Sequence, residues 1–215
     1  MYDLSQPLVD GAEPYPGDPV VRLSPVATYD ADGYRLTELT CGSHAGTHVD
    51  APAHTEPEGK TLADFPIDRF VLDAVTVDCR DLTARDPIQP ERVPETDADC
   101  VVFQTGWDEH FDTERYYDHP FLAPTTARRC ATRGYDVGLD TLNPDPTPSP
   151  NATENEPEGL QAHHELLGAN CLIIENLTGL DPLPRRFELR AYPLAIDGDE
   201  GGDGAPVRAV GVEHG

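Results

Sequence analysis

The sequence predicts a β-rich α/β fold in a single domain that spans residues 1–215. A chain of 215 residues has room for one substantial core and is short for two ordinary domains. Short apolar or alternating segments rich in valine and isoleucine recur along the whole chain, whereas few segments carry helix signals. No internal repeat interrupts this pattern, so one sheet-rich domain is expected.

The predicted strands are segments in which apolar, often β-branched residues run together or alternate with polar ones. They are residues 20–29, 34–40, 70–79, 99–105, 135–140, 170–176, 187–195 and 205–212.

Two segments have the start and stop signals of helices. Residues 123–134 have Pro124 near their start and Gly134 as a stop. Residues 158–169 carry spaced leucines and end near Gly168.

Two further segments are irregular. Residues 142–159 are dense in proline, asparagine and acid, which is typical of a linker or a long loop. The residues that follow are too few for a separate domain, so we expect a long loop near a functional site. The acidic, glycine-rich run at 197–204 is interpreted as a solvated turn between the last two strands, without a function.

The charge balance bears on partners and source. The net charge is −25, and Lys60 is the one lysine among fifteen basic residues. Such a surface would repel nucleic acid and anionic lipid, so neither is expected as a partner. Acids scattered along the chain with almost no lysine are typical of halophile proteins, whose self-repulsion is screened by salt. We therefore expect a halophilic source, and the acidity does not identify a substrate.

Cysteine usage and the chain start indicate the compartment. Five cysteines without a C-x-x-C pair predict small buried hydrophobic residues in a reducing compartment rather than disulfides; they are Cys41, Cys79, Cys100, Cys130 and Cys171. There is no apolar run of 18 residues, and the acidic start does not resemble a signal peptide. A soluble, cytoplasmic protein is expected.

The segment CGSHAGTHVDAPAH, residues 41–54, holds three of the eight histidines. His44, His48 and Asp50 offer two imidazoles and a carboxylate, a ligand set that zinc and manganese accept. On a straight strand His44 and His48 would lie roughly 13 Å apart, too far to share an ion. A bend at Gly46 followed by an extended step from 48 to 50 would bring all three ligands together.

His54 follows Pro52, which redirects the chain, so it can lie beside the ion without binding it. That position suits a general acid or base. Surface histidines that merely cluster in a loop are the alternative, but the small residues between these four side chains favour a metal site with room for a substrate.

Further ligands are expected from residues 162–177. Glu175 ends an apolar run, where a charged group is costly unless it is paired or binds a cation. His163 and His164 lie near the start of the predicted helix, and the chemistry does not choose between them.

The segment SHAGTHVDAPAH resembles the H-x-G-T-H-x-D-x-P-x-H signature of the cyclase family of metal hydrolases, which includes bacterial kynurenine formamidases and isatin hydrolases. Other segments resemble the family in the same order, over nearly the whole chain: DLSQPL, YPGDP, QTGW, YYDHPFLAP, VGLDTLNPD and HHELLGANCLIIENLTGL. The resemblance implies the swivelling β/β/α fold and a homodimer or homotetramer.

The resemblance also implies roles for individual residues. His44, His48 and Asp50 match the ligands of a first metal. Asp50 also bridges to a second metal, and the family's gap of twelve residues before Glu175 selects His163 as that metal's histidine. Zn²⁺ or Mn²⁺, one or two per subunit, would be the cofactor, and His54 matches the proton donor and acceptor.

For activity, the resemblance implies hydrolysis of an amide of a small aromatic compound, with N-formyl-L-kynurenine giving L-kynurenine and formate. Tyr15 stands where the family's formamidases have a tryptophan against the substrate. The smaller ring weakens the substrate assignment more than the chemistry. Hydrolysis of another carbonyl compound, such as a cyclic amide, is the runner-up. A non-catalytic metal-binding protein with a closed site is the alternative from another class.

Two further residues have open interpretations. Trp107 would line the pocket or lie in the core. Asp140 would orient a ligand histidine or cap the next turn.

Overall fold

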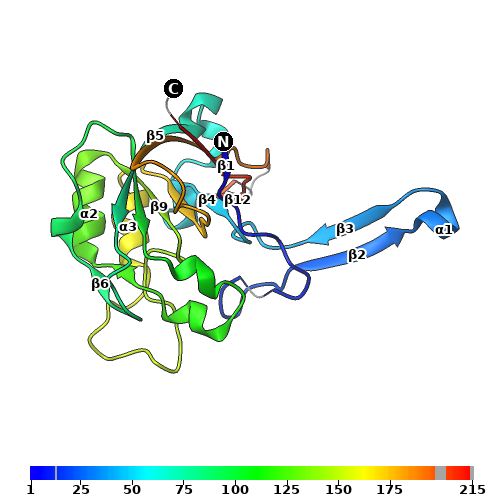
Figure 1. Cartoon of the computed structure of the whole chain (residues 1–215), viewed down its shortest axis with the longest axis horizontal. Coiled ribbons are helices and arrows are strands. Elements are labelled where there is room, and N and C mark those ends of the chain that lie inside the picture. Colours follow the sequence, from blue (N-terminus) through cyan, green and yellow to red (C-terminus); the bar gives the residue numbers. More distant parts are fainter. Residues whose placement is uncertain (13, 197–201, 214–215) are drawn as a thin grey trace.

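The structure is a computed structural model that describes residues 1–12, 14–196 and 202–213. One nine-stranded mixed sheet forms its centre (Figure 1). In spatial order its strands are β1 (Tyr2–Asp3), β13 (Val210–Val212), β11 (Arg186–Arg190), β5 (Val71–Asp78), β7 (Cys100–Gln104), β9 (Asp136–Leu139), β10 (Ile173–Glu175), β4 (His48–Asp50) and β12 (Gly204–Pro206).

The middle of the sheet is parallel and its flanks are antiparallel. Strands β5, β7, β9 and β10 run parallel to one another, whereas β11 and β4 pair antiparallel at either side. Strands buried on both faces read as continuous apolar runs, which explains the sequences of β7 and β10.

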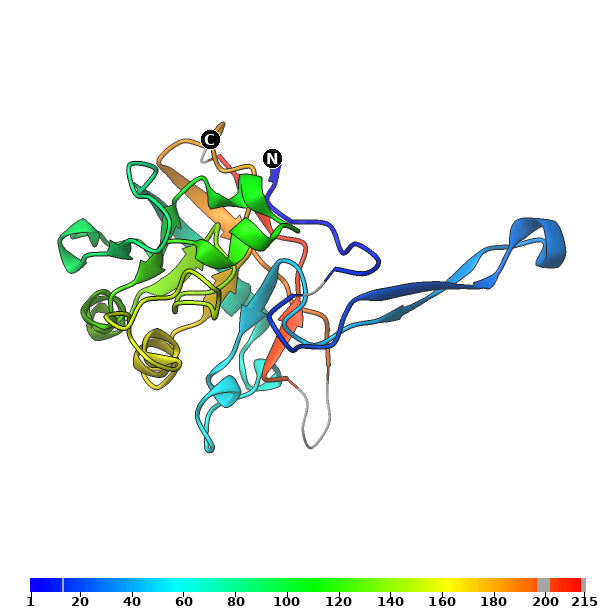
Figure 2. The same ribbon diagram turned by 90° about the horizontal axis from the view of Figure 1, so that it is seen from below.

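Side chains of one strand alternate between two apolar clusters. Val101 and Phe103 of β7 pack on the side of helices α2 (Pro124–Arg133) and α3 (Gln161–Leu167), whereas Cys100 and Val102 pack in the second cluster on the opposite face. Figures 1 and 2 show both helices side by side on one side of the sheet. The period of two along a strand therefore fills both faces with apolar side chains.

A long hairpin leaves the body of the molecule. It consists of β2 (Arg22–Ala27), the short helix α1 (Tyr29–Asp32) at its tip, and β3 (Leu36–Thr40), and it projects outward in both views (Figures 1 and 2). Its large apolar side chains are exposed; they are Val26, Tyr29, Tyr34, Leu36 and Leu39.

Shorter elements complete the fold. Strands β6 (Pro87–Ile88) and β8 (Phe121–Leu122) form a small parallel pair. Single 3₁₀ turns cover residues Pro52–His54, Leu62–Asp64, Ile67–Phe70, Pro90–Arg92, Trp107–His110 and Glu114–Asp118.

The predicted class, a sheet-rich α/β fold with few helices, is confirmed. Each predicted strand segment contains or overlaps an observed strand; β11 begins one residue before the segment 187–195, and residues 205–212 overlap both β12 and β13. The helix expected over 158–169 is shorter, because α3 covers only Gln161–Leu167. Of the predicted turn at 197–204, residues 197–201 lie outside the described residues.

The cysteines behave largely as small apolar side chains. All five are free; Cys79, Cys100, Cys130 and Cys171 are buried, whereas Cys41 is only partly buried. Burial raises the pKa of the Cys79, Cys130 and Cys171 thiols to about 12, so these thiols stay protonated. Within the described ranges, no helix is both long and apolar enough to cross a membrane.

His119 is a buried histidine outside the cluster predicted from the sequence. Its Nδ1 lies 2.8 Å from the Pro120 carbonyl oxygen, and its Nε2 lies 2.8 Å from Thr147 Oγ1. Burial lowers the pKa of this imidazole to about 4, so it is neutral in the folded protein.

The free energy of unfolding should therefore decrease as the pH is lowered. The unfolded chain protonates His119 at a higher pH than the folded chain does. Between pH 6.5 and 4 the unfolded chain binds a proton here that the folded chain does not, which removes about 3 kcal/mol of stability. Denaturant unfolding at a series of pH values should show a steeper loss for the wild type than for His119→Asn. Parallel pH profiles of the two proteins would contradict this expectation.

Candidate functional site

The site starts from the pairing of β4 with β10. In their antiparallel register Glu175 lies opposite His48, and Ile173 lies opposite Asp50. His48 and Asp50 are two residues apart on one strand, so their side chains share a face. His48 Nε2 accordingly lies 3.1 Å from Glu175 Oε2 and 3.3 Å from Asp50 Oδ1.

Gly46 provides the bend that the sequence predicted. It has a φ of +63°, a conformation that favours glycine, and a Cβ there would lie 2.8 Å from Leu8 Cδ2. The bend returns His44 toward β4, so that His44 Nδ1 lies 2.8 Å from Asp50 Oδ1. The ring centroids of His44 and His48 are 5.1 Å apart.

Of the two adjacent histidines on α3, only His163 reaches the cluster. Its Nε2 lies 3.3 Å from Glu175 Oε1 and 3.7 Å from Asp50 Oδ2. His164 faces away, with 58% of its side chain exposed, and its Nδ1 lies 2.9 Å from Glu56 Oε1.

Three overlapping groups of potential metal ligands result among the described residues. Two of them share Asp50: His44, His48 and Asp50 form one, and Asp50, His163 and Glu175 form the other. The third comprises His44, His54 and Asp203, which are all only partly buried. Within each group one ligand atom per residue lies within 4.8 Å of the others. This geometry makes the cluster a candidate site for one or two divalent ions.

Unsatisfied polar atoms test whether the cluster fits a cation. In the described part of the chain, four buried side-chain atoms lack a hydrogen-bond partner, and three of them are His48 Nε2, Asp50 Oδ2 and Glu175 Oε1. Buried polar atoms normally have partners, so three unpartnered atoms that face one another are suited to bind a cation. The donor set and its geometry therefore fit a divalent metal.

The electrostatics agree with that fit. Burial alone would lower the pKa of the His48 and His163 imidazoles, but the neighbouring carboxylates outweigh burial and hold both pKa values well above the usual range. For Asp50, burial would raise the pKa, yet the attraction of His48 and His44 holds it well below the usual range. The cluster thus concentrates negative charge that calls for positive charge to balance it.

The outer nitrogens of the imidazoles are held by groups around the cluster. His48 Nδ1 lies 2.8 Å from the Gly46 carbonyl oxygen, and His163 Nδ1 lies 2.7 Å from Asp145 Oδ2. An Nδ1–H directed outward leaves Nε2 of each ring directed at the cluster, as in the metal sites of other proteins.

Two carboxylates around the cluster were not predicted. Asp145 also accepts hydrogen bonds from the backbone N–H groups of Ala162 and His163, so it caps α3 while orienting His163. Asp203 lies beside His44 and His54, and hydrogen bonding to these histidines holds the pKa of its carboxyl below the usual range. Asp145 is distant from α3 in sequence, and Asp203 lies in an acidic run that resembles a solvated turn, so no local signal marks either.

A cavity of about 400 Å³ opens on the cluster. His44, His48, His163 and Glu175 form one wall of it, and the half-buried Tyr15 and His54 line it as well. Its remaining lining includes the apolar residues Pro14, Leu142, Pro146, Pro148 and Leu160, and the polar residues Asp18 and Asn143. His54 has 26% of its side chain exposed and its ring centroid lies 4.0 Å from that of His44.

The predicted long loop, residues 142–159, contributes much of this cavity. Arg85, with only 8% of its side chain exposed, anchors the loop to the body. Its guanidinium donates to the Thr147 carbonyl and to Ser149 Oγ, both at 3.1 Å, and to Glu156 Oε1 at 2.7 Å. The buried guanidinium of Arg85 therefore holds the proline-rich loop, and the cavity wall that it forms, against the body of the protein.

Contacts show where Trp107 and Asp140 lie, and for Asp140 the turn that it caps is not the next one along the chain. Trp107 is buried against Tyr116 and Leu142, and its Nε1–H donates to the Arg115 carbonyl, so it is a core residue. Asp140 accepts hydrogen bonds from the backbone N–H groups of Thr105 and Gly106. It also accepts a hydrogen bond from the Thr105 hydroxyl, so it caps the turn after β7.

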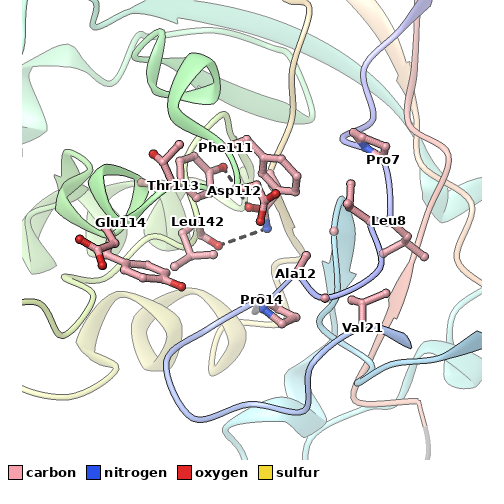
Figure 3. A pocket seen from close by; sticks show the side chains of 16 residues that line it. Pro7, Leu8, Ala12, Pro14, Val21, Phe111, Asp112, Thr113, Glu114 and Leu142 are labelled. Carbon is pink, nitrogen blue, oxygen red and sulfur yellow. Dashed lines mark hydrogen bonds between the residues drawn. The ribbon is translucent and has the colours of Figure 1, made fainter. Parts of the chain in front are cut away.

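A second cavity, of about 330 Å³, shares Pro14 and Leu142 with the first. Figure 3 shows Phe111 and Leu142 on one side of it and the N-terminal segment with Leu8 and Ala12 on the other. Asn176 lines it with a left-handed φ of 56°. Tyr116 Oη donates to Asn176 Oδ1, and Asn176 Nδ2 donates to the Leu142 carbonyl, which fixes the backbone directly after Glu175.

Comparisons with known proteins agree with the site. The model of the Cyclase family matches residues 2–146. A kynurenine formamidase of Salinibacter ruber is 34% identical over 217 residues, which cover 98% of this chain and 96% of that protein.

Solved structures show the same fold. A structure described as a potential metal-dependent hydrolase with cyclase activity is 26% identical, with a TM-score of 0.77 over 100% of this chain and 98% of that one. An isatin hydrolase bound to thioisatinate is 22% identical, with a TM-score of 0.82 over 98% and 91% of the two chains. A family match over residues 2–146 and a relative similar along nearly the whole length show that this chain belongs to the cyclase family.

Proposed function

We propose that this chain is a metal-dependent hydrolase that cleaves the C–N bond of a small aromatic amide, with N-formyl-L-kynurenine giving L-kynurenine and formate. The observation that carries the proposal is the cluster around Asp50, which opens on a cavity that also contains His54. The full-length similarity to a kynurenine formamidase supports the choice of substrate.

In this proposal the cluster holds Zn²⁺ or Mn²⁺, one or two per subunit. His44, His48 and Asp50 bind the first ion, and Asp50, His163 and Glu175 bind the second. Such an ion, when bound, supplies Lewis-acid chemistry and lowers the pKa of water. A closed structural site is disfavoured because the ligands line an open cavity.

The side chains around the cavity have separate tasks. His54 is the general acid that gives a proton to the departing nitrogen, because an imidazole exchanges protons near neutral pH and this one faces the cavity. Tyr15 contacts the aromatic ring of the substrate. The prolines of the loop and Leu160 exclude water from the reacting groups.

We also propose that the protein is a homo-oligomer and that the hairpin of residues 22–40 packs against a second copy. The hairpin carries exposed valine, leucine and tyrosine side chains away from the body, where nothing in the described chain covers them. A clustered apolar surface of this kind typically marks an interface. The acidic composition suggests that both assembly and activity depend on high salt.

Metal binding should raise the melting temperature of the protein. At a metal concentration of 100 times Kd the free energy of unfolding should increase by about 2.7 kcal/mol. Thermal scans with chelator and with Zn²⁺ or Mn²⁺, in low and molar salt, measure it. His163→Ala should reduce the shift, whereas the matched variant His164→Ala should keep it. Equal shifts for the two variants would remove His163 from the site.

Formate release from N-formyl-L-kynurenine should depend on His54. His54→Ala should lower kcat by about 10²- to 10⁴-fold, because the leaving nitrogen loses its proton donor. The same variant should retain the metal-dependent thermal shift. Isatin, a cyclic amide, serves as the competing substrate. Turnover of isatin without turnover of the formamide would show that the proposed substrate is wrong, whereas the proposed hydrolase activity would stand.

Charged residues on the hairpin should separate the subunits. Val26→Glu with Leu36→Glu changes only exposed side chains, so the body should remain folded. Light scattering after size exclusion should give a multiple of one chain's mass for the wild type and a single chain's mass for the variant. A wild type that already runs as a monomer in molar salt would contradict the assembly.

A further inference from the structure

Asp203 directly precedes β12, which pairs with β4, the strand that carries the proposed ligands His48 and Asp50. In the antiparallel pairing of β12 with β4, Gly204 lies opposite Asp50. The Ala51 backbone N–H donates to the Asp203 carbonyl at 2.8 Å. The backbone of Asp203 is therefore fixed relative to Asp50 by the sheet, one residue before β12 begins.

One carboxylate oxygen of Asp203 faces two histidines. Its Oδ2 lies 2.8 Å from His44 Nε2 and 3.8 Å from His54 Nδ1. Ser43 Oγ also donates to this oxygen, at 3.3 Å. The His44 and His54 rings lie 4.0 Å apart between centroids and are tilted by 37°, so a single carboxylate can hold the edges of both.

Gly204 makes this arrangement sterically possible. A Cβ on Gly204 would lie 2.5 Å from His44 Cε1 and 3.0 Å from both ring nitrogens. The imidazole therefore occupies the space that a side chain at 204 would need. Asp203 and Gly204 both affect the position of the His44 ring. Asp203 binds a ring nitrogen, and Gly204, without a side chain, leaves room for the ring to pack against its backbone.

We propose that Asp203 is a positioning residue that fixes a proposed metal ligand, His44, and the proposed general acid, His54, in one orientation. By holding Nε2 of His44, it leaves Nδ1 directed at Asp50 and the metal position. By facing Nδ1 of His54, it leaves the opposite edge of that ring free for the cavity. The inference rests on the proposed function for the role of His54.

Loss of the carboxylate should therefore affect two measurable properties. Groups that orient a ligand histidine typically change metal affinity by about 10- to 100-fold when they are replaced. An asparagine at 203 keeps the size of the side chain but has no negative charge to hold the two rings. The geometry thus predicts weaker metal binding and a separate loss in the chemical step.

The experiment compares Asp203→Asn and Gly204→Ala with the control Asp181→Asn. Asp181 is a carboxylate paired with Arg80, outside the cluster and its cavity. The Zn²⁺ dissociation constant is measured by competition with a chromophoric chelator, and kcat and KM for N-formyl-L-kynurenine are measured at saturating Zn²⁺. Circular dichroism checks that each variant is folded.

The expected result is a Zn²⁺ dissociation constant about 10- to 100-fold higher for Asp203→Asn and for Gly204→Ala, with the control unchanged. At saturating Zn²⁺, Asp203→Asn should also lower kcat with KM little changed, because His54 loses its orientation. Zinc affinity of Asp203→Asn equal to that of the control would overturn the proposal, and so would an unchanged kcat at saturating metal.

The two proposals fail in different ways. If the wild type binds Zn²⁺ but does not hydrolyse the formamide, the proposed substrate is wrong, and the zinc affinities still decide whether Asp203 orients His44. If Asp203→Asn does not fold, Gly204→Ala tests the placement of the same ring without changing the carboxylate. A Gly204→Ala variant with wild-type zinc affinity would then overturn the inference.

Discussion

The architecture around the candidate site depends on one electrostatic constraint. Asp50 and Glu175 are buried beside each other, and each has an acceptor atom without a hydrogen-bond donor among the described residues. Such an arrangement is unfavourable unless positive charge balances it. The pairing of β4 with β10 imposes it, since the strands hold His48 directly opposite Glu175. The helix with His163, the bend at Gly46 and the start of β12 all place imidazoles around these carboxylates.

Much of the fold was predictable because the sheet is buried on both faces. Continuous apolar runs at 99–105 and 170–176 could be recognised without knowing their neighbours, and Pro124 and Gly134 bound α2 as expected. The hairpin of residues 22–40 was recognised as two strands but not as a projection. A local alternation of side chains does not state whether a core lies beneath it.

The geometry of the candidate cluster was predictable where its residues are close in sequence. Gly46 could be identified as the hinge between His44 and His48 because few other residues there permit the bend. Choosing His163 over His164 required the family resemblance, since adjacent residues on a short helix offer the same chemistry. Asp145 and Asp203 were missed because their partners are brought to them by tertiary structure, and neither contact has a local pattern.

The position of β4 in the sheet also sets the order in which the protein can fold. Both of its neighbours, β10 and β12, come from the last quarter of the chain, whereas the strands of the hairpin pair with each other across a few residues. Closing such long loops is slow compared with forming a local hairpin. During synthesis the segment with His44, His48 and Asp50 therefore has no strand partner and is exposed to solvent until β10 and β12 have been synthesised.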